Sequence, residues 1–368
     1  MASSHDRASG SHAGTSVAEP PHPAPTQVSR RTILGATTAR DPLSAVLRAV
    51  KFKGALFFLV DASSPWGVRV PRAGDFASII LPGVQHVLSY HIVLEGSGWA
   101  SIPGVPAAQF EAGDVLVFPH GDPYAMLSAP GQAPELDEAE TLDFFRDMVA
   151  GKLPFIIQEG GGGPNRAQFV CGFLGCDTHP FNPLIDALPR LLLVRRNSGT
   201  SRDLLDQLIE VTLAETQREC AGGECVRLGL SELMFVEVVR RHLETLAPDQ
   251  TGWFAGLRDY RIGRVLGLLH QRPAHDWTLE ELGREAGMSR SVLAERFMDL
   301  VGYPPMNYLL RWRMQIAARR LADSSKSIAA VGAEVGYSSE AAFSRSFKRI
   351  TGVSPGRWRQ SPRMTRSC

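Results

Sequence analysis

The first third of the chain contains short apolar runs separated by glycine and proline. The runs are Ala55–Asp61, Trp66–Val70, Phe76–Leu81, His86–Leu94, Trp99–Ile102 and Asp114–Phe118. Runs of this length between turn residues are typical of β-strands, and their spacing predicts a small all-β barrel or sandwich. A further strand is expected at Phe169–Leu174, and a short helix near Leu142–Ala150.

The pattern becomes helical in the middle of the chain. Apolar residues recur at spacings of three and four within Pro183–Leu193, Asp203–Arg218 and Leu228–Leu246. In the two longer segments these positions are Leu204, Leu208, Val211, Leu233, Val236, Val239 and Leu243. Such spacing predicts amphipathic helices. The two longer helices are expected to pack as an antiparallel pair, which is a candidate dimerisation element.

The C-terminal hundred residues contain an internal repeat. Five positions recur after 49 residues: Leu279, Leu282, Gly283, Ala286 and Gly287 match Ile328, Val331, Gly332, Val335 and Gly336. Four more recur after 50 residues: Leu293, Phe297, Gly302 and Pro305 match Phe343, Phe347, Gly352 and Pro355. The one-residue slip falls between the halves of each copy, where a turn can absorb it.

Each copy predicts a helix-turn-helix. The first helix ends near a glycine, Ser289 or Ser338 is available to cap the second helix, and the apolar positions of the second helix are four apart. Gly283 and Gly332 fall inside the first helices, where glycine costs about 1 kcal/mol relative to alanine. A close helix crossing is the expected reason for both.

A long helix is predicted between the copies, from Pro304 and Pro305 to about Ala322. Its inward positions are Leu309, Trp312, Ile316 and Leu321, and its largely outward positions are Arg311, Arg313, Arg319 and Arg320. About 17 residues give a rod of roughly 25 Å, comparable with the roughly 34 Å between successive major grooves on one face of DNA. Two recognition helices could therefore enter adjacent grooves. The alternative, a helical array that binds protein, fits two basic copies poorly.

Charge divides the chain into two parts of opposite sign. The formal net charge is +1, but 19 basic and 10 acidic residues lie from Ala255 onward, against 20 basic and 28 acidic residues before it. A basic module behind an acidic one indicates a polyanion-binding domain attached to a domain with another role. A solvated basic surface would explain the charge alone equally well.

Composition narrows the class of protein. No stretch approaches the roughly 20 apolar residues of a membrane span, so no membrane partner is expected. The first forty residues are rich in Ser, Ala, Pro, His and Thr and resemble a disordered tail rather than a signal peptide. Five cysteines without an export signal indicate a reducing compartment, and we expect a cytoplasmic protein.

Residues Arg313–Arg359 carry Gly-Tyr, Phe-x-Arg-x-Phe-Lys and Gly-x-Ser-Pro elements, and resemble the second half of the AraC/XylS DNA-binding domain. The resemblance extends over about Gly256–Gln360 and implies sequence-specific binding to double-stranded promoter or operator DNA. It implies base-facing positions at Arg290, Ser291, Ala294, Glu295, Glu340, Ala341, Ser344 and Arg345. The phosphate-contacting candidates are Arg296, Lys348, Arg349 and Arg357.

Phe76–Met126 resembles the cupin-like sensing domain that precedes many AraC-type modules, notably in the segments Tyr90–Trp99 and Phe110–Gly121. A metal-dependent cupin would need several converging histidines. The available residues are His86, His91 and His120, but Ser89 occupies the place of a close His-x-His partner and Tyr124 that of a later histidine. We therefore expect no cofactor and favour a pocket for a small-molecule effector.

Two cysteine pairs have four residues between their members. Cys171 and Cys176 form one, and Cys220 and Cys225 the other. The spacing permits a metal or thiol switch without favouring it. Cys171 is expected to be a buried strand residue, whereas Cys220 and Cys225 lie in a predicted loop and are the better candidates for redox or metal sensing.

These observations predict a multidomain α+β protein. The expected order is a tail (1–40), a cupin-like β-barrel (41–200), a helical pair (201–250), an all-α domain with two helix-turn-helix units joined by a linker helix (256–360), and a second tail (361–368). The favoured function is that of a transcription regulator, with RNA polymerase and a second copy of the chain as candidate partners. The alternatives are a metal-dependent cupin enzyme with a DNA-binding appendage, and a non-specific architectural DNA binder.

Overall fold

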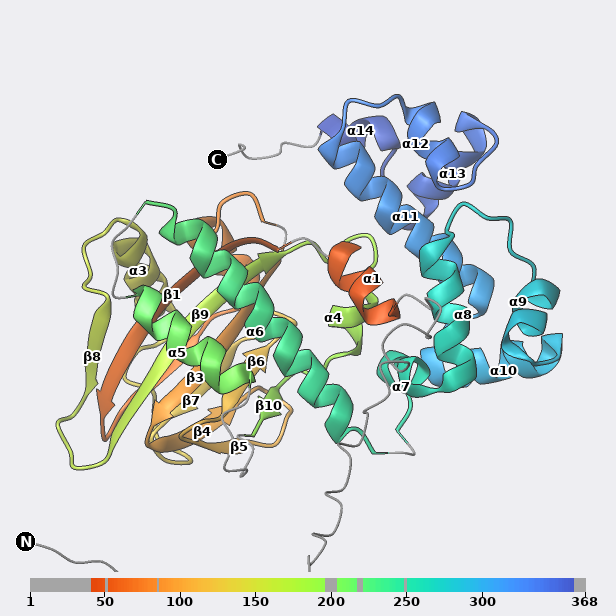
Figure 1. The fold of residues 1–368 in the computed structure, drawn as a ribbon. Helices are drawn as coiled ribbons and strands as arrows, with labels where there is room; N and C mark the ends of the chain where they lie inside the picture. Colours follow the sequence, from red (N-terminus) through yellow and green to blue (C-terminus); the bar gives the residue numbers. More distant parts are fainter. Residues whose placement is uncertain are drawn as a thin grey trace, which may run out of the picture. The chain divides into compact units, whose positions relative to one another are not determined.

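The computed structural model describes residues 41–49, 52–84, 86–195, 204–216, 221–247 and 250–360. The predicted tails and Cys220 lie outside the described residues, so the expectations for them are left as predictions. The N-terminal region is built on β-sheet and the C-terminal region is helical, as the sequence predicts (Figure 1).

The strands of the described region form two sheets. The six-stranded sheet has the order β10-β6-β3-β9-β1-β8 and the four-stranded sheet has the order β2-β7-β4-β5. The bounds are β1 (Phe52–Ser63), β2 (Gly67–Val70), β3 (His86–Glu95), β4 (Ser97–Ser101), β5 (Ala108–Glu111), β6 (Val115–Phe118), β7 (Tyr124–Leu127), β8 (Ile156–Gly160), β9 (Arg166–Cys176) and β10 (Leu192–Val194). Neighbouring strands pair antiparallel except β1 and β8, which are parallel.

The six-stranded sheet is buried on both faces, and this explains why β3 and β9 are nearly continuous apolar runs. Successive side chains of a strand point to opposite faces. In β3, Tyr90 and Ile92 belong to one core cluster, whereas Val87 and Val93 belong to the other. The side of Val87 and Val93 forms the interior between the sheets, and the side of Tyr90 and Ile92 is covered by helices.

One predicted strand is a helix. Residues Phe76–Leu81 fall largely in α2 (Ala73–Ile80), so the strand prediction there was wrong. The buried residues of α2 are Ala73, Phe76, Ala77 and Ile80. Their spacing of three and four is helical. A short apolar run suits either a helix or a strand, and only the polar positions around it distinguish the two.

The predicted helix Pro183–Leu193 is only partly present. Helix α4 (Pro183–Ala187) ends early, and Leu192 begins strand β10. Leu188 has extended backbone angles because it precedes Pro189, whose ring disfavours the helical conformation of the residue before it. The predicted helix near 142–150 corresponds to α3 (Glu138–Val149), and a further helix, α1 (Pro42–Ala49), precedes the first strand.

The two longer amphipathic segments form α5 (Leu204–Thr216) and α6 (Gly223–Thr245), which lie beside one face of the six-stranded sheet (Figure 1). The residues that α6 buries include Leu230, Met234, Phe235, Val238 and Val239. Several of the predicted apolar positions do not face the sheet. Leu204, Val211 and Leu233 are about half exposed, together with Val226.

The C-terminal region consists of helices with two cores. Its helices are α7 (Trp253–Arg258), α8 (Tyr260–Gln271), α9 (Leu279–Ala286), α10 (Arg290–Val301), α11 (Pro305–Asp323), α12 (Ile328–Glu334), α13 (Glu340–Thr351) and α14 (Pro355–Gln360). The predicted linker helix is α11. Its Leu309 and Trp312 pack with the first repeat copy, while Met314 and Leu321 pack with the second.

Candidate functional sites

The first helix-turn-helix unit consists of α9 and α10. Ser289 caps α10, because its hydroxyl accepts a hydrogen bond from the Val292 N–H at 3.4 Å. Leu293, Phe297 and Val301 are buried and hold one face of α10 against the core. The opposite face carries the predicted base-contacting residues: Arg290, Ser291 and Glu295 are exposed, and Ala294 is half-buried.

The second unit consists of α12 and α13. The cap is Ser339, whose hydroxyl accepts from the Ala342 N–H at 3.2 Å, so the prediction of Ser338 was wrong by one residue. The extra residue of the repeat precedes the cap, and position 289 therefore corresponds to position 339. Phe343 and Phe347 are buried. The predicted base-contacting residues lie on the other side: Glu340, Ala341 and Arg345 are exposed, and Ser344 is half-buried.

The two helix glycines lie at close approaches, but of different kinds. A Cβ on Gly332 would meet the Cβ and ring of Phe343 at 3.1 Å, which is the helix crossing expected from the sequence. A Cβ on Gly283 would instead lie 2.7 Å from the carbonyl oxygen of Met288, in the turn. Gly283 therefore makes room for the backbone of the turn, and Gly332 makes room for the side chain of Phe343.

Two arginines of α10 form ion pairs with acids of α9 and of the start of α8. Arg290 Nη1 lies 3.0 Å from Glu280 Oε1, and Arg296 Nε donates to Asp259 Oδ2 at 3.1 Å. Burial raises the pKa of Asp259, but the Ile262 N–H and the Arg296 guanidinium outweigh burial and hold that pKa below its ordinary value. Arg296, a phosphate-contacting candidate, is thus held against the start of α8.

The cations of α13 are not paired in this way among the described residues. Arg345, Lys348 and Arg349 are exposed, and none forms an ion pair with another residue of the described part of the chain. Arg357, the remaining candidate, is exposed on α14. Arg313 of α11 is less outward than predicted, because it donates to the carbonyls of Pro273 and His275, and burial lowers its pKa.

A small cavity lies in the interior between the two sheets. Its volume is about 30 Å³. Its walls are Phe58, Val60, Val68, Val70, His91, Tyr124, Leu136, Thr141, Phe144, Phe145, Glu159, Phe169, Cys171 and Phe173. His91 Nε2 is 2.8 Å from the Tyr124 hydroxyl, and its Nδ1 is 3.1 Å from the Cys171 sulfur. Burial lowers the pKa of His91 to about 3, so this imidazole is neutral at pH 7.

The three histidines proposed as metal candidates do not converge. His86 Nε2 is hydrogen-bonded to the Pro119 carbonyl at 2.6 Å, and His120 Nε2 to the Leu188 carbonyl at 2.8 Å, whereas His91 faces the interior cavity. Within the described residues no group of three His, Cys, Asp or Glu side chains is arranged to hold a metal.

The described cysteines are separate from one another. Cys171 and Cys176 are five positions apart on β9, so they face opposite sides of the sheet, and each is buried in a different core cluster. Burial raises the pKa of the Cys171 thiol well above its ordinary value. The expectation of a buried strand cysteine is confirmed. The prediction of a loop was wrong for Cys225, which is exposed on the first turn of α6.

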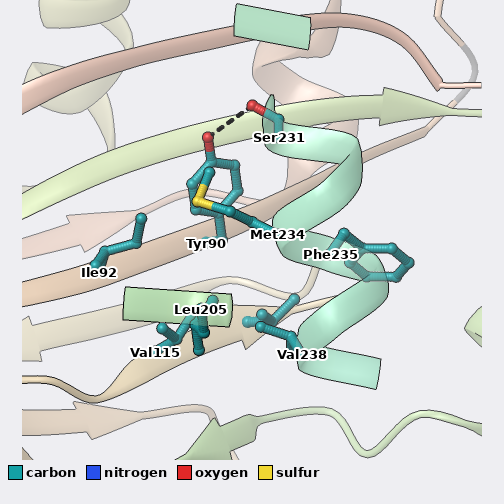
Figure 2. A pocket seen from close by; sticks show the side chains of 9 residues that line it. Tyr90, Ile92, Val115, Leu205, Ser231, Met234, Phe235 and Val238 are labelled. Atoms are coloured by element: carbon teal, nitrogen blue, oxygen red, sulfur yellow. Dashed lines mark hydrogen bonds between the residues drawn. The ribbon is translucent and has the colours of Figure 1, made fainter. Parts of the chain in front are cut away.

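A second cavity, of about 10 Å³, lies between the six-stranded sheet and α6. Figure 2 shows its apolar lining and the hydrogen bond between the hydroxyls of Tyr90 and Ser231, which are 3.0 Å apart. The Ser231 hydroxyl also donates to the Arg227 carbonyl at 2.9 Å, so Tyr90 is the donor in this pair. Burial raises the pKa of Tyr90 to about 12. This bond attaches α6 to β3.

Glu159 and Tyr90 were not predicted from the sequence as functional residues. Glu159 follows the buried residue Ile157 by two positions, so strand periodicity places it on the same face. That signal depends on recognising β8, which is short and adjoins a glycine run. Tyr90 lay within a predicted strand, but its partner Ser231 is 141 residues away, and no local pattern predicts such a contact.

Comparison with known proteins agrees with this arrangement. Residues 41–244 match the cupin family, and residues 282–361 match the helix-turn-helix domain family. The chain is 30% identical over 326 residues to an AraC-like transcription regulator of Streptomyces lividans, with 88% of this chain and 99% of the relative covered. The chain belongs to the AraC family of transcription regulators.

Two further relatives are transcriptional regulators of the helix-turn-helix type. The chain is 30% identical to the transcriptional regulator AlkR of Acinetobacter baylyi, with 79% of this chain and 93% of AlkR covered. It is 27% identical to the transcriptional regulator MtrA of Neisseria gonorrhoeae, with 73% and 85% covered.

The family decides between the functions considered from the sequence. An AraC-family protein of this organisation is a DNA-binding transcription regulator with a cupin effector domain, and the regulator prediction is confirmed. The relatives are named as transcription regulators, which disfavours the cupin enzyme. No helix within the described residues is both long and apolar enough to cross a bilayer.

Proposed function

We propose that this AraC-family regulator reads its operator through the exposed faces of the first two turns of α10 and α13, placed in successive major grooves. The observation that carries the proposal is that two serine-capped helices present their predicted base-contacting residues on the faces opposite their buried cores. A helix fits the major groove, where base edges differ in their hydrogen-bond donors and acceptors.

The side chains suggest different roles within each helix. Arg345 can bind guanine through O6 and N7, and Glu295 or Glu340 can accept from the cytosine amino group. Ala294 and Ala341 offer methyl contact with thymine, and Ser291 and Ser344 can bond to either base of a pair. Lys348, Arg349 and Arg357 contact phosphates and orient the protein without reading sequence. Arg296 already donates to Asp259, so it can contact a phosphate only while its guanidinium is shared between the phosphate and that carboxylate.

The decisive experiment is a salt-resolved binding titration. The full-length protein is titrated against its own upstream intergenic DNA, a scrambled duplex and pooled genomic fragments. Wild type is expected to prefer a genuine site over the scrambled duplex by about a thousandfold or more. Arg345→Ala should lose ~1–3 kcal/mol on the genuine site alone, whereas Lys348→Ala should weaken both duplexes equally and reduce the salt slope by about 1. Equal affinity for every fragment would contradict sequence reading.

We also propose that the two sheets form the walls of a cupin-like barrel whose interior receives a small effector. The interior cavity supports this proposal, because aromatic and aliphatic side chains surround a few polar groups there. Calorimetric titration of the full-length protein with candidate small molecules tests it.

A homodimer through α5 and α6 is part of the proposal. Leu204 and Val211 are seven residues apart on α5, as are Val226 and Leu233 on α6, and all four are about half exposed. Apolar side chains repeated every seven residues form a seam that an identical seam can cover. Leu233→Glu should shift the protein from dimer to monomer in sedimentation, whereas Val149→Glu, an equally exposed apolar position on α3, should not. A monomeric wild type would contradict the proposal.

A further inference from the structure

The interior cavity contains a carboxyl group that pairs with no other described residue. Glu159 reaches the cavity from β8, and its side chain forms no hydrogen bond or ion pair with another described residue. Burial, and secondarily the charge of Glu135, raises the pKa of Glu159 to about 7. The side chain is therefore ionised above neutral pH in a largely apolar setting, where an unpaired charge is costly.

Among the described residues, the cavity lining supplies no positive charge of its own. Its described lining has neither Lys nor Arg, and His91 is neutral and bonded to Tyr124 and Cys171. Burial keeps the Tyr124 hydroxyl and the Cys171 thiol protonated by raising their pKa values. An anionic ligand would meet Glu159 without a compensating cation, so this cavity disfavours carboxylates and phosphates.

Much of the rest of the wall is aromatic, and the remainder is mainly aliphatic. Phe58, Phe144, Phe145 and Phe173 line it, with centroid distances of 5.4 Å between Phe58 and Phe144 and 5.3 Å between Phe145 and Phe173. Ring faces attract cations, and the attraction is stronger where water is excluded. A carboxylate beside aromatic faces is complementary to an ammonium group attached to an apolar body.

We propose that the interior cavity binds a small organic amine, with its ammonium group on Glu159 and its apolar part against the phenylalanine side chains. This inference rests on the proposed function, because it names the chemical class of the effector. A cavity of about 30 Å³ has room for roughly two waters. The amine is therefore short, or it displaces the wall formed by Phe144 and Phe145 of α3.

The test uses calorimetric titration of the full-length protein at pH 8, where Glu159 is mostly ionised. The probes are butylamine and benzylamine, each compared with the alcohol and the carboxylate of the same skeleton. The amines should bind, and the alcohols and carboxylates should bind at least about tenfold more weakly. Glu159→Gln should weaken amine binding by at least about thirtyfold, whereas Glu138→Gln, an exposed acid at the start of α3, should leave it unchanged.

Glu159→Gln is expected to fold. The native state retains the Glu159 proton up to about pH 7, whereas an unfolded glutamate loses it near pH 4.5. The contribution of Glu159 to wild-type stability therefore falls as pH rises through this range, and the glutamine variant lacks this fall. Phe144→Leu provides a second variant, which should weaken the amines more than the alcohols because it removes a ring face.

The possible outcomes are distinct. Amine binding that is insensitive to Glu159→Gln, tighter binding of the carboxylates, or no binding of either amine would overturn the inference. Operator preference of the wild-type protein is measured in parallel without amine. If that preference is present and amines do not bind, only the inference fails, whereas its absence counts against the proposed function itself.

Discussion

The two helix-turn-helix units share a fold and a sequence pattern but differ in the charges they expose. In the first unit, Arg290 and Arg296 are paired with Glu280 and Asp259. In the second unit, Arg345, Lys348 and Arg349 have no ion pair among the described residues. A repeat can therefore preserve packing positions while its surface diverges, because the buried phenylalanines constrain the helices and the exposed face is constrained only by its ligand.

This difference assigns unequal roles to the two units. Attraction to phosphates depends on cations that displace counterions from DNA, and a guanidinium already bound to a carboxylate contributes less. The second unit is expected to supply most of the salt-dependent affinity. The first unit is expected to contribute through Glu295 and the small side chains of α10. The cores differ as well, since the second unit has a separate cluster of few buried residues.

The largest effect is expected from removing equivalent core rings. Phe347→Ala should cost ~3–5 kcal/mol and unfold the second unit, because few other buried side chains can compensate. Hydrogen exchange should show lost protection in residues 328–360 and retained protection in residues 260–300. Phe297→Ala, the equivalent change in the first unit, is the control. Loss of protection throughout both units in Phe347→Ala would show that they fold as one.

The next effect is on the salt dependence of DNA binding. Replacing Lys348 and Arg349 together by alanine should reduce the slope of log affinity against log salt by about 2. Replacing Arg290 and Arg296 together should reduce it by less than 1, because both are already paired. Fluorescence anisotropy at several salt concentrations measures both slopes. Equal reductions would contradict the unequal roles of the two units.

A smaller effect separates the two helix glycines. Gly283→Ala places a Cβ 2.7 Å from a backbone oxygen, so the turn must shift, and a loss of ~1 kcal/mol is expected after the gain in helix propensity. Gly332→Ala meets a phenylalanine side chain at 3.1 Å, which can move slightly, and should change stability by less than ~0.5 kcal/mol. Thermal unfolding measures the stability of both variants. A larger loss in Gly332→Ala than in Gly283→Ala would show that the turn shifts more easily than the phenylalanine side chain.

The smallest effect concerns the ion pair of the first unit. Asp259→Asn keeps a residue that can cap α8 but releases Arg296, so DNA affinity should rise by up to ~1 kcal/mol and the salt slope should steepen. Because the pKa of Asp259 is lowered in the fold, the stability it provides is present above the ordinary aspartate pKa and is lost as pH falls through the lowered value. Unchanged DNA binding by Asp259→Asn would place Arg296 outside the interface.

Prediction from sequence succeeded where the pattern was long and repeated. The fifty-residue repeat predicted both helix-turn-helix units and the linker helix, because each element has enough periodic positions to be identified. It failed for Phe76–Leu81, where a run of six residues, five of them apolar, suits either a strand or a helix. It also misjudged the exposed side of α5 and α6, because apolar periodicity does not tell which partner covers a face.

The sequence by itself determined the order of the regions, the family and the exposed faces of α10 and α13, because these depend on local spacing and on motifs that neighbouring residues carry. Only the tertiary structure decided which charges remain available. Glu280 and Asp259 neutralise α10 from other helices, and Glu159 meets the aromatic wall from a strand distant in sequence. Pairing and burial depend on distances between segments far apart in the chain, and the fold alone sets those distances.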